Sequence, residues 1–336
     1  MRPKSHICLL FTGGTIASVM DEKINALVPA KTPDQLLSLA PKLADEFDID
    51  IIFIDNVDST NIQSSHWTKL AKSIEQNYDK YDGFVVSHGT DTMAYSASAL
   101  SYALQDLGKP VVFTGAQLPP DHISSDAKNN LVNAFRIASM DLGEVVIAFG
   151  HEIVRGNRAT KQSETDFNAF QSPIYPILGK IRTEITMYGD YKRRDKTRKI
   201  KVFPEFVSDI FVLTITPSLN PKFFDLLIDN GVKGFIVNAF GTGNVPNKEN
   251  ALVWCIKKAN EKKIPVIISS QCIGGTARML TYEVGITALE AGGIPGADMT
   301  VEAATTKLMW ALGQTNDINE VKSIMKRNIS GELTEL

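Results

Sequence analysis

The sequence is poor in cysteine and lacks long apolar runs, and each scarcity excludes a class of protein. Its 336 residues include three cysteines, Cys8, Cys255 and Cys272, with no CxxC or Cys/His spacing that would clamp zinc. No apolar stretch approaches the roughly 20 residues that span a bilayer. The run from Ile7 to Phe11 is too short for a signal peptide. These features predict a cytoplasmic protein with no membrane partner.

The chain also lacks a large excess of charge. Its 35 basic residues nearly balance 38 acidic ones, for a formal net charge of -3. So small a charge gives no strong field for nucleic acid, which predicts a small-molecule partner. The sequence contains no GxxxxGK[ST], no GxGxxG after a strand, no HExxH and no GxSxG elbow. We therefore expect no metal and no organic cofactor.

What the chain does have is a regular alternation of short β-branched apolar runs and segments of helical periodicity. This alternation is typical of an α/β fold with parallel strands. Strands are predicted at Ile7–Phe11, Ile49–Ile54, Gly83–Ser87, Val111–Thr114, Val145–Phe149, Ile210–Thr214, Gly234–Asn238 and Val266–Ser270. Helices are predicted at Trp67–Tyr78, Thr92–Asp106, Asp126–Met140, Pro221–Asn230, Lys248–Lys262 and Thr300–Leu312.

The predicted elements fall into two domains. Residues 1–190 are expected to form a doubly wound, flavodoxin-like and mostly parallel sheet, and residues 210–336 a smaller α/β domain. Residues 191–209 between them are predicted to be a linker. The basic stretch from Tyr188 to Lys201 has few aromatic residues among its lysines and arginines, which favours a solvated linker over a phosphate-binding patch.

Polar residues follow each predicted strand of the N-terminal domain. In open parallel sheets, ligands bind beyond the carboxyl ends of the strands, where these residues should meet. Five loops on one rim therefore predict a small polar pocket. The loops are Thr12-Gly13-Gly14-Thr15, Asp58-Ser59-Thr60-Asn61, His88-Gly89-Thr90-Asp91-Thr92, Gly115-Ala116-Gln117 and Arg155 to Lys161.

The hydroxyls in these loops indicate nucleophilic catalysis. A threonine hydroxyl needs a neighbouring base, which a desolvated lysine oriented by a carboxylate can supply. Thr90, Lys161 and Asp91 fit these three roles. A second threonine, Thr15, lies on the glycine turn, where backbone amides near Gly14 or Thr90 can face an oxyanion. Each motif alone is also compatible with phosphate binding or helix capping, so the prediction depends on their combination.

At these motifs the chain resembles the bacterial-type L-asparaginases, in particular their cytoplasmic type I branch, and the resemblance covers nearly the whole chain. In the N-terminal half it is carried by Thr12-Gly13-Gly14-Thr15-Ile16-Ala17, His88-Gly89-Thr90-Asp91-Thr92-Met93 and the run from Arg155 to Lys161. In the C-terminal half it is carried by Gly241-Thr242-Gly243-Asn244, Ser270-Gln271-Cys272, Gly296 to Ala303 and Gly331-Glu332-Leu333-Thr334.

The resemblance implies an L-asparagine amidohydrolase that releases L-aspartate and ammonia, with a minor L-glutaminase activity. Thr15 resembles the nucleophile that forms an acyl-enzyme, and Thr90, Asp91 and Lys161 resemble the triad that supports it. The resemblance further implies a homodimer or homotetramer.

The resemblance also implies how the substrate is held. Ser59 and Thr60 resemble the clamp for the α-carboxylate, and Asp91 resembles the acceptor for the α-ammonium group. Gly14, Asp58 and Gly89 are expected in the same pocket. Such a double clamp orients a free amino acid and disfavours an internal peptide residue.

Two departures from the family pattern concern the nucleophile's partner and regulation. The segment from Ser18 to Ala30 lacks the tyrosine that many relatives carry. Tyr282 resembles the tyrosine that takes this role in some type I members, the alternative being a packed aromatic near an interface. Thr160 and Cys272 fit two positions of a candidate allosteric asparagine site, but Asn238 replaces its arginine. That replacement predicts Cys272 to be a small buried hydrophobic residue.

Three rival functions remain at this stage. A glutaminase differs only by one substrate methylene, worth ~1 to 3 kcal/mol of discrimination. An asparaginase-like subunit that deamidates glutamine for tRNA amidation usually carries an extra N-terminal domain, whereas the first motif here begins at Thr12. A silent amino-acid sensor would keep Ser59 and Asp91 but need not keep Thr15, Thr90 and Lys161 together.

Overall fold

A computed structural model of the protein describes residues 3–21, 23, 26–29, 33–248 and 251–334. Contacts divide the chain into two compact units. Unit 1 comprises Met1–Ser172 and Pro176–Pro204, and unit 2 comprises Pro173–Tyr175 and Glu205–Leu336. None of the helices within the described ranges is both long and apolar enough to cross a membrane.

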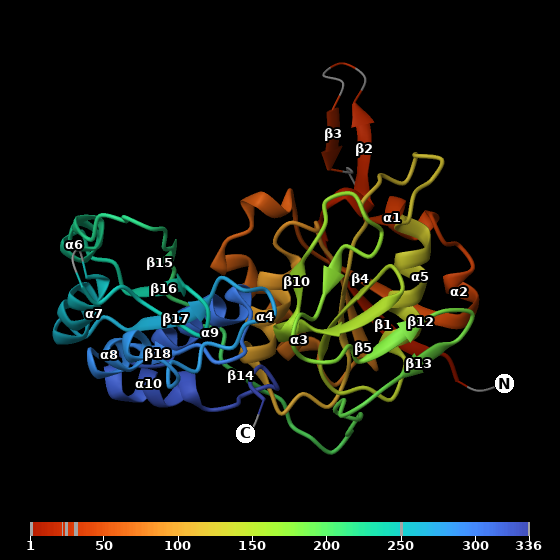
Figure 1. The fold of residues 1–336 in the computed structure, drawn as a ribbon. Helices are drawn as coiled ribbons and strands as arrows, with labels where there is room; N and C mark the ends of the chain where they lie inside the picture. Colours follow the sequence, from red (N-terminus) through yellow and green to blue (C-terminus); the bar gives the residue numbers. More distant parts are fainter. Residues whose placement is uncertain (1–2, 22, 24–25, 30–32, 249–250, 335–336) are drawn as a thin grey trace. The chain divides into compact units, whose positions relative to one another are not determined.

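Unit 1 is built on one large sheet (Figure 1). Among the described residues it has eight strands in the order β13-β12-β9-β8-β7-β5-β1-β4. The pairs β4–β1, β1–β5, β5–β7 and β7–β8 are parallel, and β8–β9, β9–β12 and β12–β13 are antiparallel. The strands are β1 (Ser5–Gly13), β4 (Phe47–Val57), β5 (Gly83–Ser87), β7 (Val111–Thr114), β8 (Val145–Phe149), β9 (Glu152–Arg155), β12 (Gly179–Ile181) and β13 (Ile185–Met187).

The parallel strands, taken in chain order, lie in the spatial order 2-1-3-4-5, which is the flavodoxin-like order. The predicted doubly wound, mostly parallel fold is thereby confirmed. The antiparallel strands β9, β12 and β13 lie outside the prediction, because they are short and carry no strong apolar run. The residues Ile7 to Phe11 of β1 are inaccessible to solvent, as expected of a central strand covered on both faces.

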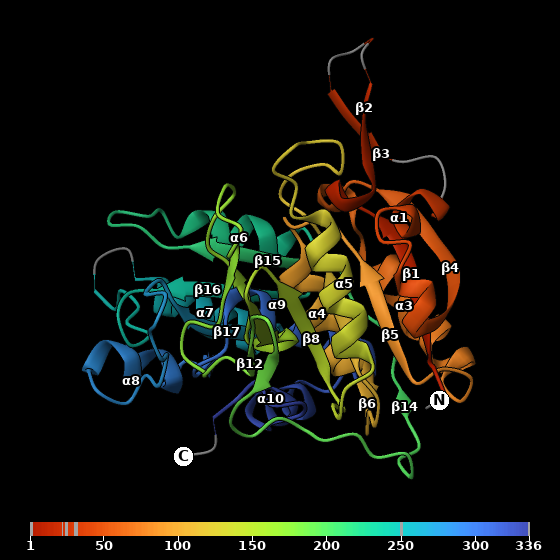
Figure 2. The same cartoon turned by 90° about the vertical axis from the view of Figure 1, so that its right-hand side faces the viewer.

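Helices α3 (Ser64–Asn77), α4 (Met93–Ala103) and α5 (Ala127–Ala138) pack on this sheet (Figure 2). α4 is almost wholly buried, and its small alanine and serine side chains allow close packing against α3 and β8. The smaller elements of unit 1 are η1 (Thr15–Ala17), β2 (Ser18–Asp21), β3 (Ala26–Pro29), α1 (Asp34–Ser38), α2 (Leu43–Glu46), η2 (Ser59–Asn61), β6 (Leu104–Gln105), η3 (Gly156–Arg158), β10 (Thr160–Lys161), β11 (Phe170–Gln171) and β14 (Lys201–Val202).

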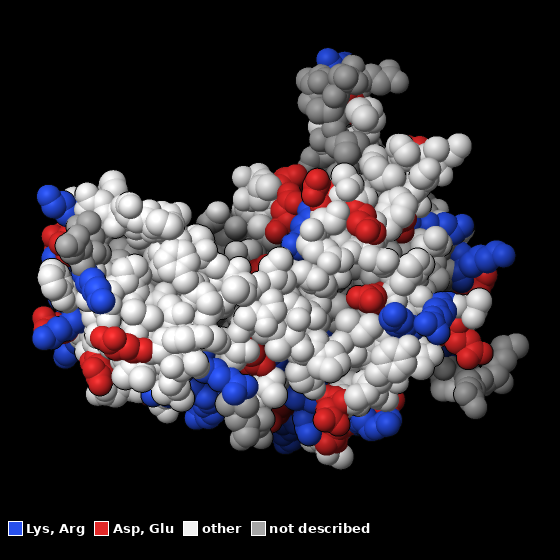
Figure 3. Space-filling view, in the orientation of Figure 1, with Lys and Arg blue, Asp and Glu red and all other residues white. Residues whose placement is uncertain are grey.

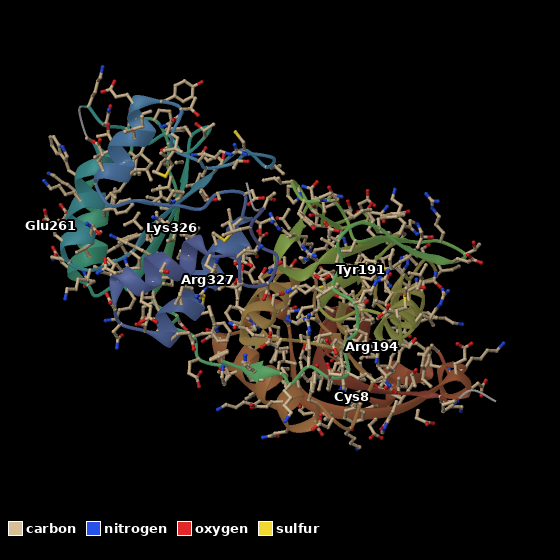
Figure 4. The ribbon with its side chains drawn as sticks, turned by 90° about the horizontal axis from the view of Figure 1, so that it is seen from below. Cys8, Tyr191, Arg194, Glu261, Lys326 and Arg327 are labelled. Atoms are coloured by element: carbon tan, nitrogen blue, oxygen red, sulfur yellow. The ribbon has the colours of Figure 1, made fainter. Side chains whose placement is uncertain are left out.

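The basic stretch from Tyr188 to Lys201, part of which is labelled in Figure 4, packs on unit 1. Arg194 is half-buried, and its guanidinium donates to the carbonyls of Asp82 and Met140. Arg193 pairs with Asp141 at 2.8 Å. Through such contacts the positions 191–204, assigned to a linker on sequence grounds, belong to unit 1. The guanidinium groups of Arg193 and Arg194 are therefore engaged by acidic and carbonyl groups of the same unit.

Unit 2 has a separate parallel sheet, which in the described part of the chain has the order β15-β16-β17-β18. Its strands are β15 (Ile210–Thr214), β16 (Gly234–Ala239), β17 (Val266–Ser270) and β18 (Ile294–Pro295). Its helices are α6 (Lys222–Asp229), α7 (Leu252–Glu261), α8 (Glu283–Glu290), α9 (Val301–Gln314) and α10 (Ile318–Lys326). The helix predicted from Lys248 begins at Leu252, and positions 249–250 lie outside the described residues.

A buried ion pair fastens the C-terminal segment of unit 2. Lys307 of α9 and Glu332 are both fully buried and lie 2.5 Å apart. The ammonium group also donates to the carbonyl of Arg327, and the carboxylate accepts the backbone N–H groups of Ile329 and Ser330. A desolvated pair of this kind persists because its remaining hydrogen-bonding capacity is satisfied.

Candidate active site

The polar rim of unit 1 lies at the point where the strand order reverses. β1 is the first strand in the chain, and its neighbours β4 and β5 follow it in sequence on opposite sides. Crossovers diverge at such a point, and in doubly wound sheets ligands bind outside the carboxyl ends of the strands that flank it. Phe11 of β1 pairs with Ser87 of β5, which brings the glycine turn after β1 beside the loop that starts at His88.

The loops at this edge are packed so closely that only glycine fits between them. Gly14 has φ +88°, and a Cβ on it would lie 2.4 Å from the nitrogen of Gly89. A Cβ on Gly89 would lie 2.6 Å from Oγ of Ser59. The turn after β1 is thus stacked backbone against backbone on the loop after β5, and that loop lies against the side chain of Ser59. Both glycines are required for space, and Gly14 is also required for its torsion angle.

Thr15 begins η1 directly after the glycine turn. The carbonyl of Gly14 accepts hydrogen bonds from the amide of Ala17 at 2.9 Å and from the hydroxyl of Ser18 at 3.1 Å, which fix the turn. Thr15 is half-buried. No other residue in the described ranges hydrogen-bonds its hydroxyl, so this group is available to an incoming molecule.

Thr90, Asp91 and Lys161 meet as the sequence predicts. The ammonium group of Lys161 donates to Oγ1 of Thr90 at 2.8 Å and to Oδ1 of Asp91 at 2.6 Å. Thr90 is 8% exposed, whereas the Asp91 side chain is 55% exposed. Lys161 is therefore held between a buried hydroxyl and a carboxylate that still faces solvent.

Lys161 reaches the rim on a short hairpin rather than directly from β8. β9 runs back antiparallel to β8, and the chain returns in β10, where Lys161 pairs with Phe170 of β11. Nε2 of Gln117 donates to the carbonyls of Ser163 and Asp166, which ties the loop after β7 to this hairpin. The buried Asp126 accepts the backbone N–H of Gln117 at 3.0 Å.

The loop after β4 carries Ser59 and Thr60, the two residues predicted to bind the substrate α-carboxylate. Ser59 is 4% exposed and lies against Gly89, within the stacked loops. The hydroxyl of Thr60 donates to Oδ1 of Asp58 at 2.7 Å, and its backbone N–H donates to the same oxygen. These hydrogen bonds hold the pKa of Asp58 below its ordinary value. The Thr60 proton is therefore committed to Asp58 rather than to a ligand.

Thr92 does not cap α4 with its side chain. Its hydroxyl instead donates to the carbonyl of Ser59 at 2.7 Å, which is a further link between the loops after β4 and β5.

Within the described part of the chain, no group of three or more histidine, cysteine, aspartate and glutamate side chains could hold a metal ion.

His88 lies at this rim and is not among the site residues predicted from the sequence. It is fully buried, with Nδ1 2.7 Å from the carbonyl oxygen of Gly89 and Nε2 2.8 Å from Oγ of Ser96. Nε1 of Trp67 donates to the same serine oxygen at 2.9 Å. Burial lowers the pKa of His88 to about 4, so the ring is neutral at pH 7. No local spacing could reveal this network, because its members come from three elements.

A cavity of about 210 Å³ lies beside the turn that carries Thr15. Neither Thr90 nor Lys161 lines it, so it is separate from the stacked polar loops. Its walls come from η1, β2, α1 and the loop after β7, namely Ile16, Ala17, Ser18, Val19, Gln35, Leu36, Ser38, Leu39, Pro120 and Asp121.

Two family models cover most of the chain. Residues 6–193 match the model described as "Asparaginase, N-terminal", and residues 209–325 match the "Glutaminase/Asparaginase C-terminal domain". The chain belongs to the asparaginase family. It is accordingly an amidohydrolase, and its resemblance to this family is confirmed.

Several members of the asparaginase family are similar to this chain over almost its full length. An L-asparaginase from Thermococcus kodakarensis is 36% identical, with 98% of this chain and 99% of that protein covered. A subunit of the glutamyl-tRNA(Gln) amidotransferase from Pyrococcus horikoshii is 34% identical, with 98% and 76% covered. The solved structure of L-asparaginase I from Vibrio cholerae has a TM-score of 0.89 at 35% identity, with 99% and 100% covered.

The remaining residues predicted from the asparaginase pattern are divided between the two units. Thr160 lies in β10 of unit 1, next to Lys161. Tyr282, Asn238 and Cys272 lie in unit 2. Tyr282 precedes α8 and is 56% exposed. The role of Tyr282 at the nucleophile therefore stays a prediction.

The candidate regulatory positions in unit 2 differ from expectation in one respect. Asn238 lies opposite Thr214, and its Nδ2 donates to the hydroxyl of Thr214 at 3.3 Å. The Oδ1 atom of Asn238 is buried and has no hydrogen-bond partner among the described residues. Cys272 is exposed, so the prediction of a small buried hydrophobic residue is wrong. It lies in a loop beyond β17 rather than inside the strand, which explains its exposure.

Gly14→Ala tests the stacking of the loops. The added methyl would overlap the Gly89 backbone, and we expect a loss of about 1 to 3 kcal/mol in the free energy of unfolding, measured by urea denaturation. Gly189→Ala is the matched control, because Gly189 also has positive φ but has no atom within 4 Å of a built Cβ. Equal losses in the two variants would show that the stacking itself contributes nothing.

The buried neutral His88 predicts a pH dependence of stability. Its folded pKa is about 4, below the ordinary 6.5, so between these values the unfolded chain binds a proton that the native state excludes. The free energy of unfolding should therefore fall as pH drops from 6.5 towards 4, by at most about 1.4 kcal/mol per pH unit from this group. Urea denaturation at pH 7 and pH 5 should show this component, and His88→Asn should remove it. An unchanged pH dependence in that variant would contradict the assignment.

Proposed function

We propose that this amidohydrolase hydrolyses L-asparagine to L-aspartate and ammonia, with Thr15 as the nucleophile. The observation that carries the proposal is the set of hydrogen bonds from Lys161 to Thr90 and Asp91, at the same rim as the Thr15 turn. A lysine held on a hydroxyl and a carboxylate matches the arrangement that activates a weak oxygen nucleophile.

The substrate is held through its amino-acid end. Oδ1 of Asp91 is engaged by Lys161, and the side chain is 55% exposed, so that its second oxygen accepts the α-ammonium group. Asp58, whose pKa lies below its ordinary value, adds a second negative group at this rim. Ser59 and the loop that follows it bind the α-carboxylate, with Thr60 joining when its hydroxyl exchanges Asp58 for the substrate. Gly14 and Gly89 line the same crevice.

The reaction proceeds in two steps with no cofactor. The Thr15 hydroxyl adds to the side-chain amide carbonyl while its proton passes through the Thr90 hydroxyl to Lys161 in its neutral amine form. Lys161 then returns a proton to the amide nitrogen, and the C–N bond breaks as ammonia leaves. Water next hydrolyses the β-aspartyl ester, which restores the Thr15 hydroxyl and releases aspartate. General-base assistance contributes about 10² to 10⁴ in rate, and one oxyanion donor a further ~10² to 10³.

Further parts of the proposal concern assembly, location and regulation. The enzyme acts in the cytoplasm as a homodimer or homotetramer, and Tyr282 hydrogen-bonds the nucleophile in the assembled site. Acidic and basic side chains are interspersed on the face shown in Figure 3, in keeping with a net charge of only -3 and a small-molecule partner. The neutral amide at Asn238 replaces a charged donor, so asparagine does not activate the enzyme through Thr160, Asn238 and Cys272.

The alternative substrate is glutamine, free or as part of tRNA amidation. It is raised by the similarity to the amidotransferase of Pyrococcus horikoshii, which is nearly as great as that to the L-asparaginase. Asparagine and glutamine share the amino-acid end that Asp91 and Ser59 would bind. The polar groups of the site therefore do not distinguish the two substrates, and only a comparison of their turnover rates does.

Ammonia release by the purified protein tests the function directly. We expect turnover of L-asparagine well above that of L-glutamine and none of D-asparagine, with a hyperbolic dependence on substrate concentration because the allosteric arginine is missing. A sigmoid would restore regulation, preferred turnover of L-glutamine would favour the alternative substrate, and no ammonia from any of the three would overturn the amidase proposal.

Single-residue variants separate the roles of the two threonines and the lysine. Thr15→Ala should abolish turnover, and Lys161→Met should lower kcat by about 10² to 10⁴ because the proton acceptor is lost. Mass spectrometry of the protein quenched in acid during turnover should find the aspartyl adduct on the peptide that carries Thr15. An adduct on the peptide that carries Thr90 would exchange the roles of the two threonines, and near-normal kcat in Lys161→Met would remove the triad.

A further inference from the structure

The hydrogen bonds around His88 have directions that can be assigned from chemistry alone. The carbonyl oxygen of Gly89 can only accept, so Nδ1 of His88 carries the proton. Nε2 of the neutral ring is then an acceptor, which the hydroxyl of Ser96 satisfies. That serine oxygen in turn accepts the indole N–H of Trp67. The chain Trp67–Ser96–His88–Gly89 is therefore a one-way series that permits one histidine tautomer.

The series ends at the carbonyl of Gly89, which belongs to the same peptide group as the backbone N–H of Thr90. The chain has no cis peptide bonds among its described residues, so the N–H of Thr90 points opposite to the carbonyl of Gly89. The hydrogen bond from His88 fixes the direction of that carbonyl, and with it the direction of the Thr90 amide. No acceptor for the Thr90 N–H exists in the part of the chain that the structure describes.

Glycine makes such a tether necessary. Gly89 must be glycine because a Cβ would overlap Ser59, yet glycine is the residue whose peptide planes turn most freely. A donor whose direction varies stabilises a developing oxyanion poorly, because catalysis of this kind depends on dipoles that are oriented in advance. The fully buried imidazole supplies the constraint that the missing side chain cannot.

We propose that His88 is a positioning residue, which aims the Thr90 backbone N–H at the oxygen of the substrate amide through its hydrogen bond to the Gly89 carbonyl. The inference rests on the proposed amidase function and deepens it, since it names the residue that orients the oxyanion donor. His88 itself touches neither the substrate nor Thr15.

A matched pair of variants tests this role. The amide nitrogen of Asn occupies the place of Nδ1 relative to Cβ, and the amide group of Gln reaches the place of Nε2, where its oxygen can accept the Ser96 hydroxyl. His88→Asn should therefore keep the hydrogen bond to Gly89, whereas His88→Gln should keep only the contact with Ser96. We expect kcat for L-asparagine within about threefold of the wild type for Asn and lowered at least tenfold for Gln, since full loss of an oxyanion donor costs ~10² to 10³. KM should change little in both variants.

Circular dichroism and thermal unfolding identify any variant that fails to fold. Equal kcat for folded His88→Asn and His88→Gln would overturn the proposal, as would a change confined to KM. A merely structural role of His88 would not depend on which of its two nitrogens is replaced, and it would not affect kcat in preference to KM.

A second measurement needs neither a variant nor turnover. The ¹⁵N spectrum of histidine-labelled wild-type protein at pH 7 should show His88 protonated at Nδ1 and unprotonated at Nε2. The opposite tautomer would overturn the inference even in an active enzyme. If the protein shows the expected tautomer but releases no ammonia, the proposed amidase function is wrong, whereas the orientation of the Gly89 carbonyl by His88 is not contradicted.

Discussion

The close approach of two glycine backbones is the constraint on which the rest of the site depends. Gly14 and Gly89 leave adjacent parallel strands, and each occupies space that no side chain could share. Because β1 and β5 lie at the reversal of strand order, their loops are the ones that a doubly wound sheet leaves free to face a ligand. Because neither glycine has a side chain, the threonines that follow them can lie at one rim.

The charged groups are arranged around this stack without occupying it. Lys161 arrives from the hairpin beyond β9 and is held by Thr90 and Asp91, while Gln117 and Asp126 secure the hairpin and the neighbouring loop. On the opposite side, Asp58 organises η2 through the amide and hydroxyl of Thr60. His88 is buried and uncharged, and it donates a hydrogen bond to the carbonyl of Gly89. The site therefore combines a rigid backbone with side chains that remain partly exposed.

Much of the fold of unit 1 and of the candidate site could be predicted from the amino-acid sequence. The parallel strands of unit 1 are short apolar runs, and the predictions at Gly83–Ser87, Val111–Thr114 and Val145–Phe149 match β5, β7 and β8 residue for residue. Lys161 was expected at this rim as a continuation of the fifth predicted strand, and it does reach Thr90, but by way of the unpredicted strand β9 rather than directly from β8. The antiparallel strands β9, β12 and β13 were not foreseen, because strands of three or four residues carry too little periodicity to be distinguished from loops.

By itself, the sequence determined the fold class, the asparaginase family and the set of polar residues that gather at one rim, because these depend on local periodicity and on short motifs. Only the tertiary structure decided which of those groups are already committed. It alone shows that Thr60 donates to Asp58, that Cys272 is exposed, and that His88 is joined to Ser96 and Trp67. Hydrogen bonds and burial of this kind join residues that are distant in sequence, and no local pattern records which pairs the packing of the elements will bring together.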